Sequence, residues 1–300
     1  MIYDISHVTR YSYETRVASS TLALRVTPRD DGGQRCLDHG VAISPEPRSL
    51  TIEHDFFGNT VSIALIETGL VDLNIAARAR VDVSRSAGPA QGSGPDVKDL
   101  VDQVAKIESV AGDSPAHFIF PSRRISLRRD IADYAASSFA TPRPVLDGAR
   151  ELAARIRKDF KYQPNSTAVF TPIEQAFEQR RGVCQDFAHI MISGLRSLGI
   201  PASYVSGYIR TIPPPGKPRL AGADATHAWV SVWCGAEVGW VGIDPTNAID
   251  AGNDHIMLAV GRDFSDVSPI YGVFLGSGAQ ELEVGVDVIP VTPAAVPSAT

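Results

Sequence analysis

Apolar residues recur with two different periods along this chain, and the change from one period to the other constrains the fold more than any other feature. Over residues 1–84 they alternate with other residues, as at Leu22, Leu24 and Val26, which is the period of a strand with one buried face. From Val97 onward the apolar spacing becomes helical in several segments. The sequence therefore predicts an α+β fold that begins with an antiparallel β-sandwich.

A segment rich in Gly, Ser, Pro and Ala lies where the period changes, at residues 85–95. It has too few apolar side chains to pack, so we expect a linker between two domains. The first would be the β-sandwich domain at residues 1–84 and the second would occupy residues 96–290. Residues 291–300 are expected to form a flexible tail.

The second domain is expected to begin with helices and to continue with strands. Gly199 and the following Ile200-Pro201 end a helical pattern that starts at Cys184. Helices are predicted at residues 97–110, 125–139, 145–160, 173–180 and 184–198. Strands are predicted at residues 202–210, 228–233, 240–243, 255–260, 270–275 and 282–289.

Charge and cysteine content argue against several partners and cofactors. A net charge of -6 and a pI near 5.6 leave no excess positive charge for phosphates or anionic headgroups, so we expect neither nucleic acid nor a membrane as partner. The first twenty residues include Asp4, Arg10 and Glu14 and lack the apolar run of a signal peptide, which predicts a cytoplasmic protein. The three cysteines form no CxxC pair, so no disulfide framework, metal or other cofactor is implied.

Cys184 stands at the start of a predicted helix, directly before the periodic apolar residues of segment 187–198. The positive end of the helix dipole stabilises negative charge at that position, which favours a nucleophilic thiolate. The alternative is a buried structural cysteine, a frequent fate of free cysteines. We interpret Cys36 and Cys234 as structural.

A thiolate nucleophile needs a base for its proton and a third group that orients the base. His189 lies five residues along the same helix, roughly 140° around it from Cys184, and cannot readily reach the thiol. His227 enters a predicted strand and Asp244 ends another, so adjacent strands would place the carboxylate beside the imidazole. Taken alone, Asp244 and the following Pro245 are typical of a turn, and the three residues in this order favour a triad.

Three motifs carry a resemblance to a known family: GVCQDFAHIMISGLRSLGIPASYVSGYI, THAWVSVW and GWVGIDPTN. Together they resemble the core of the transglutaminase-like superfamily, in particular the bacterial transglutaminase-like proteins that are also described as candidate cysteine proteases. HVTRYSYE, LRVTPRD and DFFGN resemble the N-terminal β domain of that family. HIMLAVGRDFSDVSPIYGVF resembles its C-terminal segment.

The resemblance implies a papain-like core in which a helix bearing the cysteine packs on an antiparallel sheet bearing His and Asp. It implies Cys184 as nucleophile, His227 as base and then acid, and Asp244 as the residue that orients His227. In related enzymes an aromatic residue upstream of the cysteine helps its backbone N–H to hold the oxyanion. Tyr162 occupies the matching region and has a hydroxyl to donate, although core packing is the commoner role of such a residue.

The expected reaction is acyl transfer from an amide or peptide bond of a protein or peptide substrate, through a thioester on Cys184. Water as acceptor gives a cysteine peptidase or amidase, which we favour because water needs no binding site. An amine as acceptor gives a protein-glutamine transglutaminase, and a non-catalytic binding or scaffolding module is the alternative from another class. The Pro-rich loop at residues 211–224 is either a solvated loop or a lid over the cleft, and no feature specifies an oligomeric state.

Overall fold

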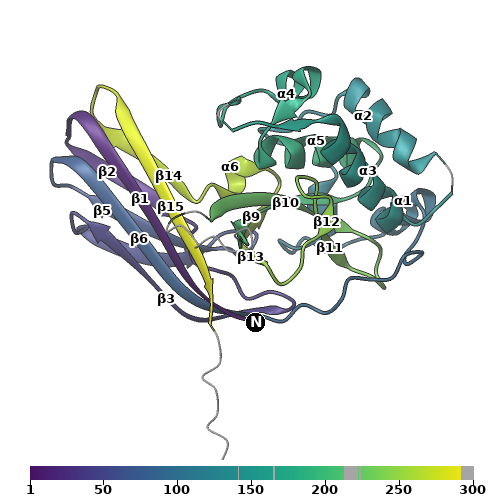
Figure 1. The fold of residues 1–300 in the computed structure, drawn as a ribbon, viewed down its shortest axis with the longest axis horizontal. Helices are drawn as coiled ribbons and strands as arrows, with labels where there is room; N and C mark the ends of the chain where they lie inside the picture. Colours follow the sequence, from purple (N-terminus) through teal and green to yellow (C-terminus); the bar gives the residue numbers. More distant parts are fainter. Residues whose placement is uncertain (141, 165, 213–221, 223, 292–300) are drawn as a thin grey trace, which may run out of the picture.

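Strands from the first part of the chain, together with two strands from near its C-terminal end, form two four-stranded antiparallel sheets. This computed structural model describes residues 1–140, 142–164, 166–212, 222 and 224–291. The sheets have the strand orders β15-β1-β6-β3 and β14-β2-β5-β4. The first six strands are β1 (Ile2–Val17), β2 (Ser19–Leu24), β3 (Gln34–Ser44), β4 (Ser49–His54), β5 (Thr60–Ile66) and β6 (Leu70–Val83). Figure 1 shows the two sheets at the end of the molecule away from the helices.

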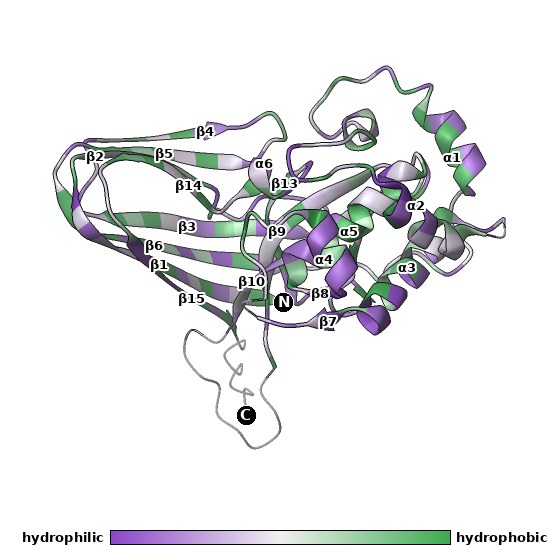
Figure 2. Ribbon diagram, turned by 90° about the horizontal axis from the view of Figure 1, so that it is seen from above, coloured by the Kyte–Doolittle hydropathy of each residue, from purple (hydrophilic) through white to green (hydrophobic). Residues whose placement is uncertain are grey.

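Alternating apolar residues of these strands fill the space between the two sheets. Leu24 of β2 and Ile66 of β5 are buried together with Leu73 and Ile75 of β6, in one apolar cluster. Figure 2 shows the two sheets as separate layers. The period-two pattern is thus explained by burial of one face of each strand, and the predicted antiparallel β-sandwich is confirmed.

The last two strands return to this sandwich, a pairing that the expected second domain at residues 96–290 did not include. β15 (Gln280–Pro290) pairs with β1 from Tyr3↔Pro290 to Tyr13↔Gln280, and β14 (Ile270–Leu275) pairs with β2. In Figure 1 purple β1 and yellow β15 lie side by side. Alternation identifies a strand but not its partner, so the sequence pattern could not assign these two strands to a sheet. Val291 N–H donates to the Ile2 carbonyl, and the other residues of the expected tail lie outside the described residues.

The rest of the chain forms a mixed helical and antiparallel core, as the predicted α+β class requires. Its five-stranded sheet has the order β12-β11-β10-β9-β13. The strands are β9 (Ala202–Ile209), β10 (Ala225–Trp233), β11 (Trp240–Asp244), β12 (Ile249–Asp250) and β13 (His255–Gly261), and a small parallel pair is formed by β7 (Lys161–Tyr162) and β8 (Arg181–Gly182). The helices are α1 (Val97–Val104), α2 (Arg129–Ala136), α3 (Val145–Asp159), α4 (Ile173–Gln179), α5 (Cys184–Ser197) and α6 (Phe264–Val267).

Helix α5 is the centre of this core and packs on the sheet. Phe187, Ile190 and Leu195 on α5 are buried in one cluster with Ala228 and Val230 of β10. The pattern from Cys184 onward therefore predicted this helix well. Two other predicted helices are shorter, because the expected helix 97–110 ends at Val104 and the expected helix 125–139 begins at Arg129. Within the described residues, no helix is long and apolar enough to cross a membrane.

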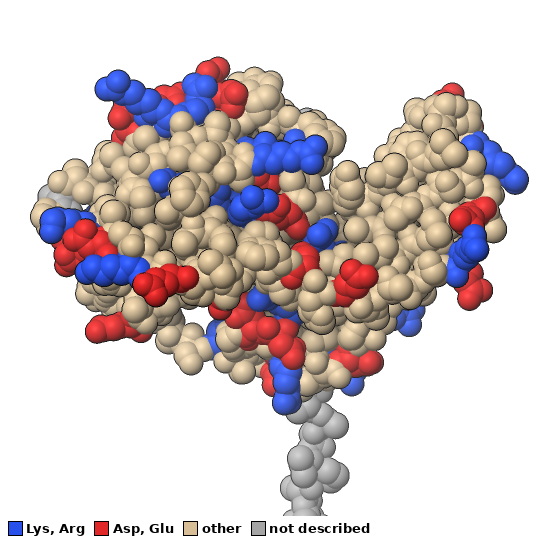
Figure 3. Space-filling model, turned by 180° about the vertical axis from the view of Figure 1, so that it is seen from behind, with Lys and Arg blue, Asp and Glu red and all other residues tan. Residues whose placement is uncertain are grey.

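The β-sandwich and the core meet along a third apolar cluster. It contains Tyr3 and Ile5 of β1, Tyr208 of β9, and Ile256 and Leu258 of β13. The expected linker also lies against the core, since the Pro89 carbonyl accepts a hydrogen bond from Arg150 Nη2. In Figure 3 the surface is hollowed between the tip of the sandwich and the helical part, and acidic and basic side chains are intermixed on this face.

Candidate active site

The start of α5 is fixed by a buried carboxylate two residues after Cys184. Asp186 Oδ2 accepts hydrogen bonds from Val183 N–H at 2.8 Å and from Thr167 Oγ1 at 2.7 Å, and its side chain is almost fully buried. Cys184 is the first residue of the helix, and its side chain is partly exposed. The local fold therefore presents an accessible thiol at a helix N-terminus, where backbone N–H groups have no partner within the helix.

His227 lies between the thiol and a buried carboxylate. Its Nε2 is 2.8 Å from Asp244 Oδ2, and the ring is 7% exposed. Burial by itself lowers the pKa of His227, but the hydrogen bonds to Asp244 and Cys184 outweigh this and raise the pKa to about 10. Because Nε2 faces Asp244, Nδ1 is the ring nitrogen available to the thiol. The structure thus places His227 against Asp244, and Cys184 is near enough to affect the pKa of His227.

Asp244 ends β11, and the turn after it surrounds its carboxylate with N–H donors. Oδ1 accepts from Thr246 N–H at 2.8 Å and from Asn247 N–H at 3.2 Å, while Oδ2 accepts from Asn247 Nδ2 at 2.7 Å. Burial tends to raise the pKa of Asp244, but the hydrogen bonds from His227, His255 and Asn247 hold it well below its ordinary value. The turn and the triad are therefore compatible interpretations of the same segment, because the turn fixes the carboxylate.

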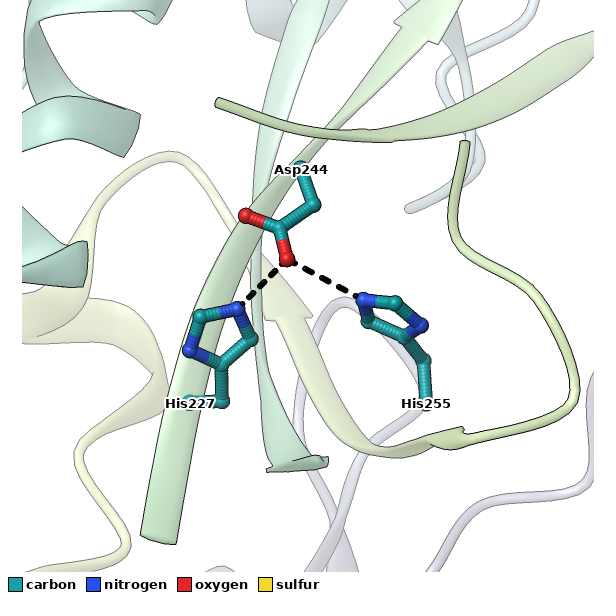
Figure 4. Close-up of side chains that lie close together, drawn as sticks. All are labelled: His227, Asp244 and His255. Atoms are coloured by element: carbon teal, nitrogen blue, oxygen red, sulfur yellow. Dashed lines mark hydrogen bonds and ion pairs between the residues drawn. The ribbon is translucent and has the colours of Figure 1, made fainter. Parts of the chain in front are cut away.

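Sequence reasoning missed a second histidine at Asp244. His255 Nε2 is 3.2 Å from Asp244 Oδ2, and Figure 4 shows that the rings of His227 and His255 approach this oxygen from opposite sides. His255 is the first residue of β13 and is 1% exposed. Only the pairing of β13 with β9 brings it near the site, so its spacing from Asp244 in the sequence carried no signal.

Tyr162 lies near Cys184. Its strand β7 pairs with β8, which ends two residues before Cys184, and its ring contacts Phe187 of α5 at 6.3 Å between centroids. Burial and the nearby Cys184 raise the pKa of Tyr162. The side chain is 45% exposed, so its place is the rim of the site and not the core.

His189 faces a different part of the core. Its Nε2 accepts a hydrogen bond from Phe264 N–H at 3.2 Å, and its ring contacts Tyr204 at 5.0 Å between centroids. Asp186, three residues before His189 on the same helix, is hydrogen-bonded to Val183 and Thr167 and not to His189. The structure therefore gives His189 a packing role. The proposed lid at residues 211–224 falls mainly on residues 213–221 and 223, which lie outside the described residues.

Known proteins share this architecture along most of the chain. Residues 3–82 match the family model described as the bacterial transglutaminase-like N-terminal region, and residues 132–245 match the model of the transglutaminase-like superfamily. An uncharacterized protein of Mycobacterium tuberculosis (strain H37Rv) is 37% identical over 292 residues, which cover 96% of this chain and 92% of that protein. This chain belongs to the transglutaminase-like superfamily. The family predicted from its motifs is confirmed.

Two further relatives extend the comparison. A Cytophaga hutchinsonii protein, described as a candidate cysteine protease, has a crystal structure that matches with a TM-score of 0.74 and 21% identity, covering 98% of this chain and 92% of that one. At this identity the match shows a shared fold. A protein-glutamine gamma-glutamyltransferase of Pseudomonas aeruginosa is 32% identical over 126 residues, which are 39% of this chain and 18% of that protein.

Three side chains of the site, those of His227, Asp244 and His255, are of the types that bind metal ions. One atom each from His227, Asp244 and His255 lies within 4.8 Å of the others, close enough to hold a divalent metal. A metal-bound histidine donates its other ring N–H to an acceptor. His255 does the reverse, because Gly252 N–H donates to its Nδ1 at 3.2 Å. Its proton then lies on Nε2, so the arrangement fits a hydrogen-bonded carboxylate better than a metal.

Proposed function

We propose that this protein is a Cys-His-Asp acyl-transfer enzyme that acts on amide or peptide bonds. The observation that supports the proposal is the buried ring of His227, which is hydrogen-bonded to Asp244 and lies close enough to Cys184 for the thiol to raise the pKa of the ring. A partly exposed thiol beside a base, with a carboxylate that orients the base, is the arrangement that nucleophilic catalysis requires.

In the proposed first half-reaction, Cys184 becomes acylated. Nδ1 of His227 takes the thiol proton, which gives a thiolate–imidazolium pair, and the thiolate sulfur then attacks the carbonyl carbon of the amide. Negative charge develops on the carbonyl oxygen, where the backbone N–H of Cys184 and the hydroxyl of Tyr162 donate hydrogen bonds. The C–N bond then breaks as His227 gives its proton to the departing amine, which leaves a thioester on the sulfur.

In the second half-reaction an acceptor removes the acyl group. His227 takes a proton from the acceptor as its oxygen or nitrogen attacks the thioester carbon, and the C–S bond breaks. The proton returns to the sulfur and restores the thiol. Throughout, the buried charge of Asp244 stabilises the imidazolium form of His227, which is the source of its raised pKa.

We favour water as acceptor, because water needs no dedicated site, and this makes the protein a cysteine peptidase or amidase with a protein or peptide substrate. The alternative is a protein-glutamine transglutaminase. The observation that favours it is the 32% identity over 126 residues to the Pseudomonas aeruginosa glutamyltransferase. A non-catalytic binding module would retain the fold without turnover, and the complete Cys184, His227 and Asp244 set argues against it. The cytoplasmic location stays a prediction, which cell fractionation tests.

Selective alkylation tests whether Cys184 is a nucleophile. Burial and the nearby Asp30 raise the pKa of the Cys36 thiol, and burial raises the pKa of Cys234 to about 12, so both serve as internal controls. With a small excess of iodoacetamide at pH 6, mass mapping should show that Cys184 reacts at least about 10-fold faster than either control. Equal labelling of Cys184 and Cys36 would overturn the enzyme proposal.

Turnover then distinguishes the acceptors. Peptide-amide substrates are incubated with and without a primary amine, and the products are identified by mass. Hydrolysis gives the free acid under both conditions, whereas transfer gives an amide of the added amine. A Cys184→Ala variant should have neither hydrolase nor transferase activity. Full activity in that variant would contradict the proposal that Cys184 is the nucleophile.

A further inference from the structure

We propose that His255 is a positioning residue that holds the carboxylate of Asp244 in place for His227. The inference rests on the proposed function and adds a fourth side chain to its site. His255 Nε2 and His227 Nε2 face the same carboxylate oxygen, at 3.2 and 2.8 Å. Asp244 is fully buried, so the groups around its carboxylate determine both its charge and its orientation.

The protonation of His255 follows from its second ring nitrogen. Gly252 N–H donates to Nδ1, which must therefore be unprotonated, and the neutral ring then carries its proton on Nε2. His255 is thus a fixed hydrogen-bond donor to Asp244, in a tautomer selected by the backbone. A neutral donor strengthens the ionised form of the carboxylate without supplying a charge that competes with the imidazolium of His227.

The ring of His255 is locked by its neighbours. Trp229 and His255 pack edge to face, with 5.2 Å between ring centroids and an interplanar angle of 75°. The same Trp229 stacks on His227, at 6.2 Å and 27°. Arg85 Nη1 donates to the carbonyl oxygens of Gly252 and His255, and so fixes both ends of the loop that presents Nδ1 with its donor. Within the described part of the chain, the charged or titratable groups that contact His255 or its loop include His227, Asp244 and Arg85.

The strand that carries His255 is held by the β-sandwich. β13 is an edge strand, and its outer backbone groups are paired by side chains of the first domain. Asn59 accepts from Val260 N–H through Oδ1 and donates to its carbonyl through Nδ2, each at 2.8 Å. Gln34 makes the equivalent pair with Met257. The position of His255 therefore depends on the N-terminal domain as well as on the core.

Removal of the donor leaves Asp244 with less support on the oxygen that binds His227. Thr246 and Asn247 still hold Oδ1, but the shared Oδ2 loses one of its three N–H donors, namely those of His227, His255 and Asn247. The carboxylate then has more freedom to rotate, and the imidazolium of His227 is less well stabilised. The consequence is a smaller population of the thiolate–imidazolium pair at mildly acidic pH.

Alkylation of Cys184 as a function of pH tests the proposal in the full-length protein. In His255→Phe the rate of Cys184 alkylation at pH 6 should fall about 10-fold, which is the size of effect expected when a residue that orients a functional side chain is lost. The onset of alkylation should move to higher pH, and the rates should converge near pH 9, where a cysteine thiolate forms without help. His255→Gln keeps an N–H donor at nearly the same reach and should remain within about 3-fold of the wild type.

His7→Phe is the matched control. His7 is also buried, at 3% exposure, and is hydrogen-bonded to Tyr208 and Thr9, and neither partner belongs to the proposed site. It should lose stability without a change in the pH profile. If His255→Phe and His7→Phe give the same profile as the wild type, or if His255→Gln is as impaired as His255→Phe, His255 does not position Asp244.

The tautomer gives a second test, which is read in the wild-type protein. Nitrogen-15 spectra of the histidine rings in the wild type should show His255 as the neutral Nε2–H form, with His255→Gln used for assignment. A ring protonated on Nδ1 would overturn the proposal. Neither test uses a substrate. A negative result in either one would reject the role of His255 alone, whereas the absence of turnover in the wild type would reject the proposed function.

Discussion

Gln34 of the β-sandwich forms both backbone hydrogen bonds of Met257 on the core strand β13. Its Nε2 donates to the Met257 carbonyl and its Oε1 accepts from Met257 N–H, each at 2.8 Å. The side-chain amide thus takes the place of a neighbouring strand at an edge that would otherwise have unpaired backbone groups. The two domains are joined by directional bonds as well as by apolar packing.

Loss of this pair should destabilise the whole protein. Gln34 is 5% exposed, and Gln34→Leu removes the partner of Met257 N–H and leaves the Met257 carbonyl with only the longer hydrogen bond from Arg29 N–H, at a cost of about 2 kcal/mol. Urea unfolding measures the loss, with Gln91→Leu in the exposed connecting segment as control. An equal and small effect of the two substitutions would show that the domains do not depend on this contact.

The raised pKa of His227 makes stability depend on alkaline pH. An unfolded histidine has a pKa of about 6.5, whereas hydrogen bonds to Asp244 and Cys184 raise that of folded His227 to about 10. The folded state therefore keeps a proton that the unfolded state releases. The stability advantage of the wild type over His227→Gln should be full below pH 6.5 and should shrink as pH rises toward 10. Chemical unfolding at a series of pH values checks this, and a constant difference would contradict it.

Asp186 should also make stability fall as pH rises, because its pKa is raised, whereas paired carboxylates usually have a lowered pKa. Burial raises its pKa, in spite of the hydrogen bonds from Val183 and Thr167. The unfolded chain releases the carboxyl proton of Asp186 at about pH 4, and the folded protein releases it only at higher pH. The wild type should therefore lose stability relative to Asp186→Asn as pH rises from 4 through the folded pKa. Parallel stability curves for the two proteins would refute the assignment.

Tyr162 should contribute to turnover but not to alkylation. If its hydroxyl donates to the oxyanion, Tyr162→Phe should lower kcat on a peptide amide about 100-fold with KM nearly unchanged. Iodoacetamide forms no oxyanion, so the alkylation rate of Cys184 should stay close to the wild-type value. Tyr271→Phe, at an exposed tyrosine of β14, is the control. Slower alkylation in Tyr162→Phe would instead indicate damage to the nucleophile itself.

The sequence by itself determined the elements that carry the site and their order. Cys184 begins a helix, His227 enters a strand and Asp244 ends one, as the local periodicity and the turn residues predicted. These features are local, because helical and extended conformations depend mainly on the spacing of apolar residues and on nearby turn or capping residues. Motif order was sufficient to predict the family as well.

The tertiary structure alone decided which distant segments meet. β15 joins β1, Gln34 reaches Met257, and His255 arrives at Asp244 because β13 pairs with β9. None of these contacts leaves a periodic pattern, since a strand shows the same alternation whichever partner it has. Cys184 and His227 could therefore be proposed as nucleophile and base from the residues, whereas the second histidine at Asp244 and the support of its strand by the β-sandwich required the folded chain.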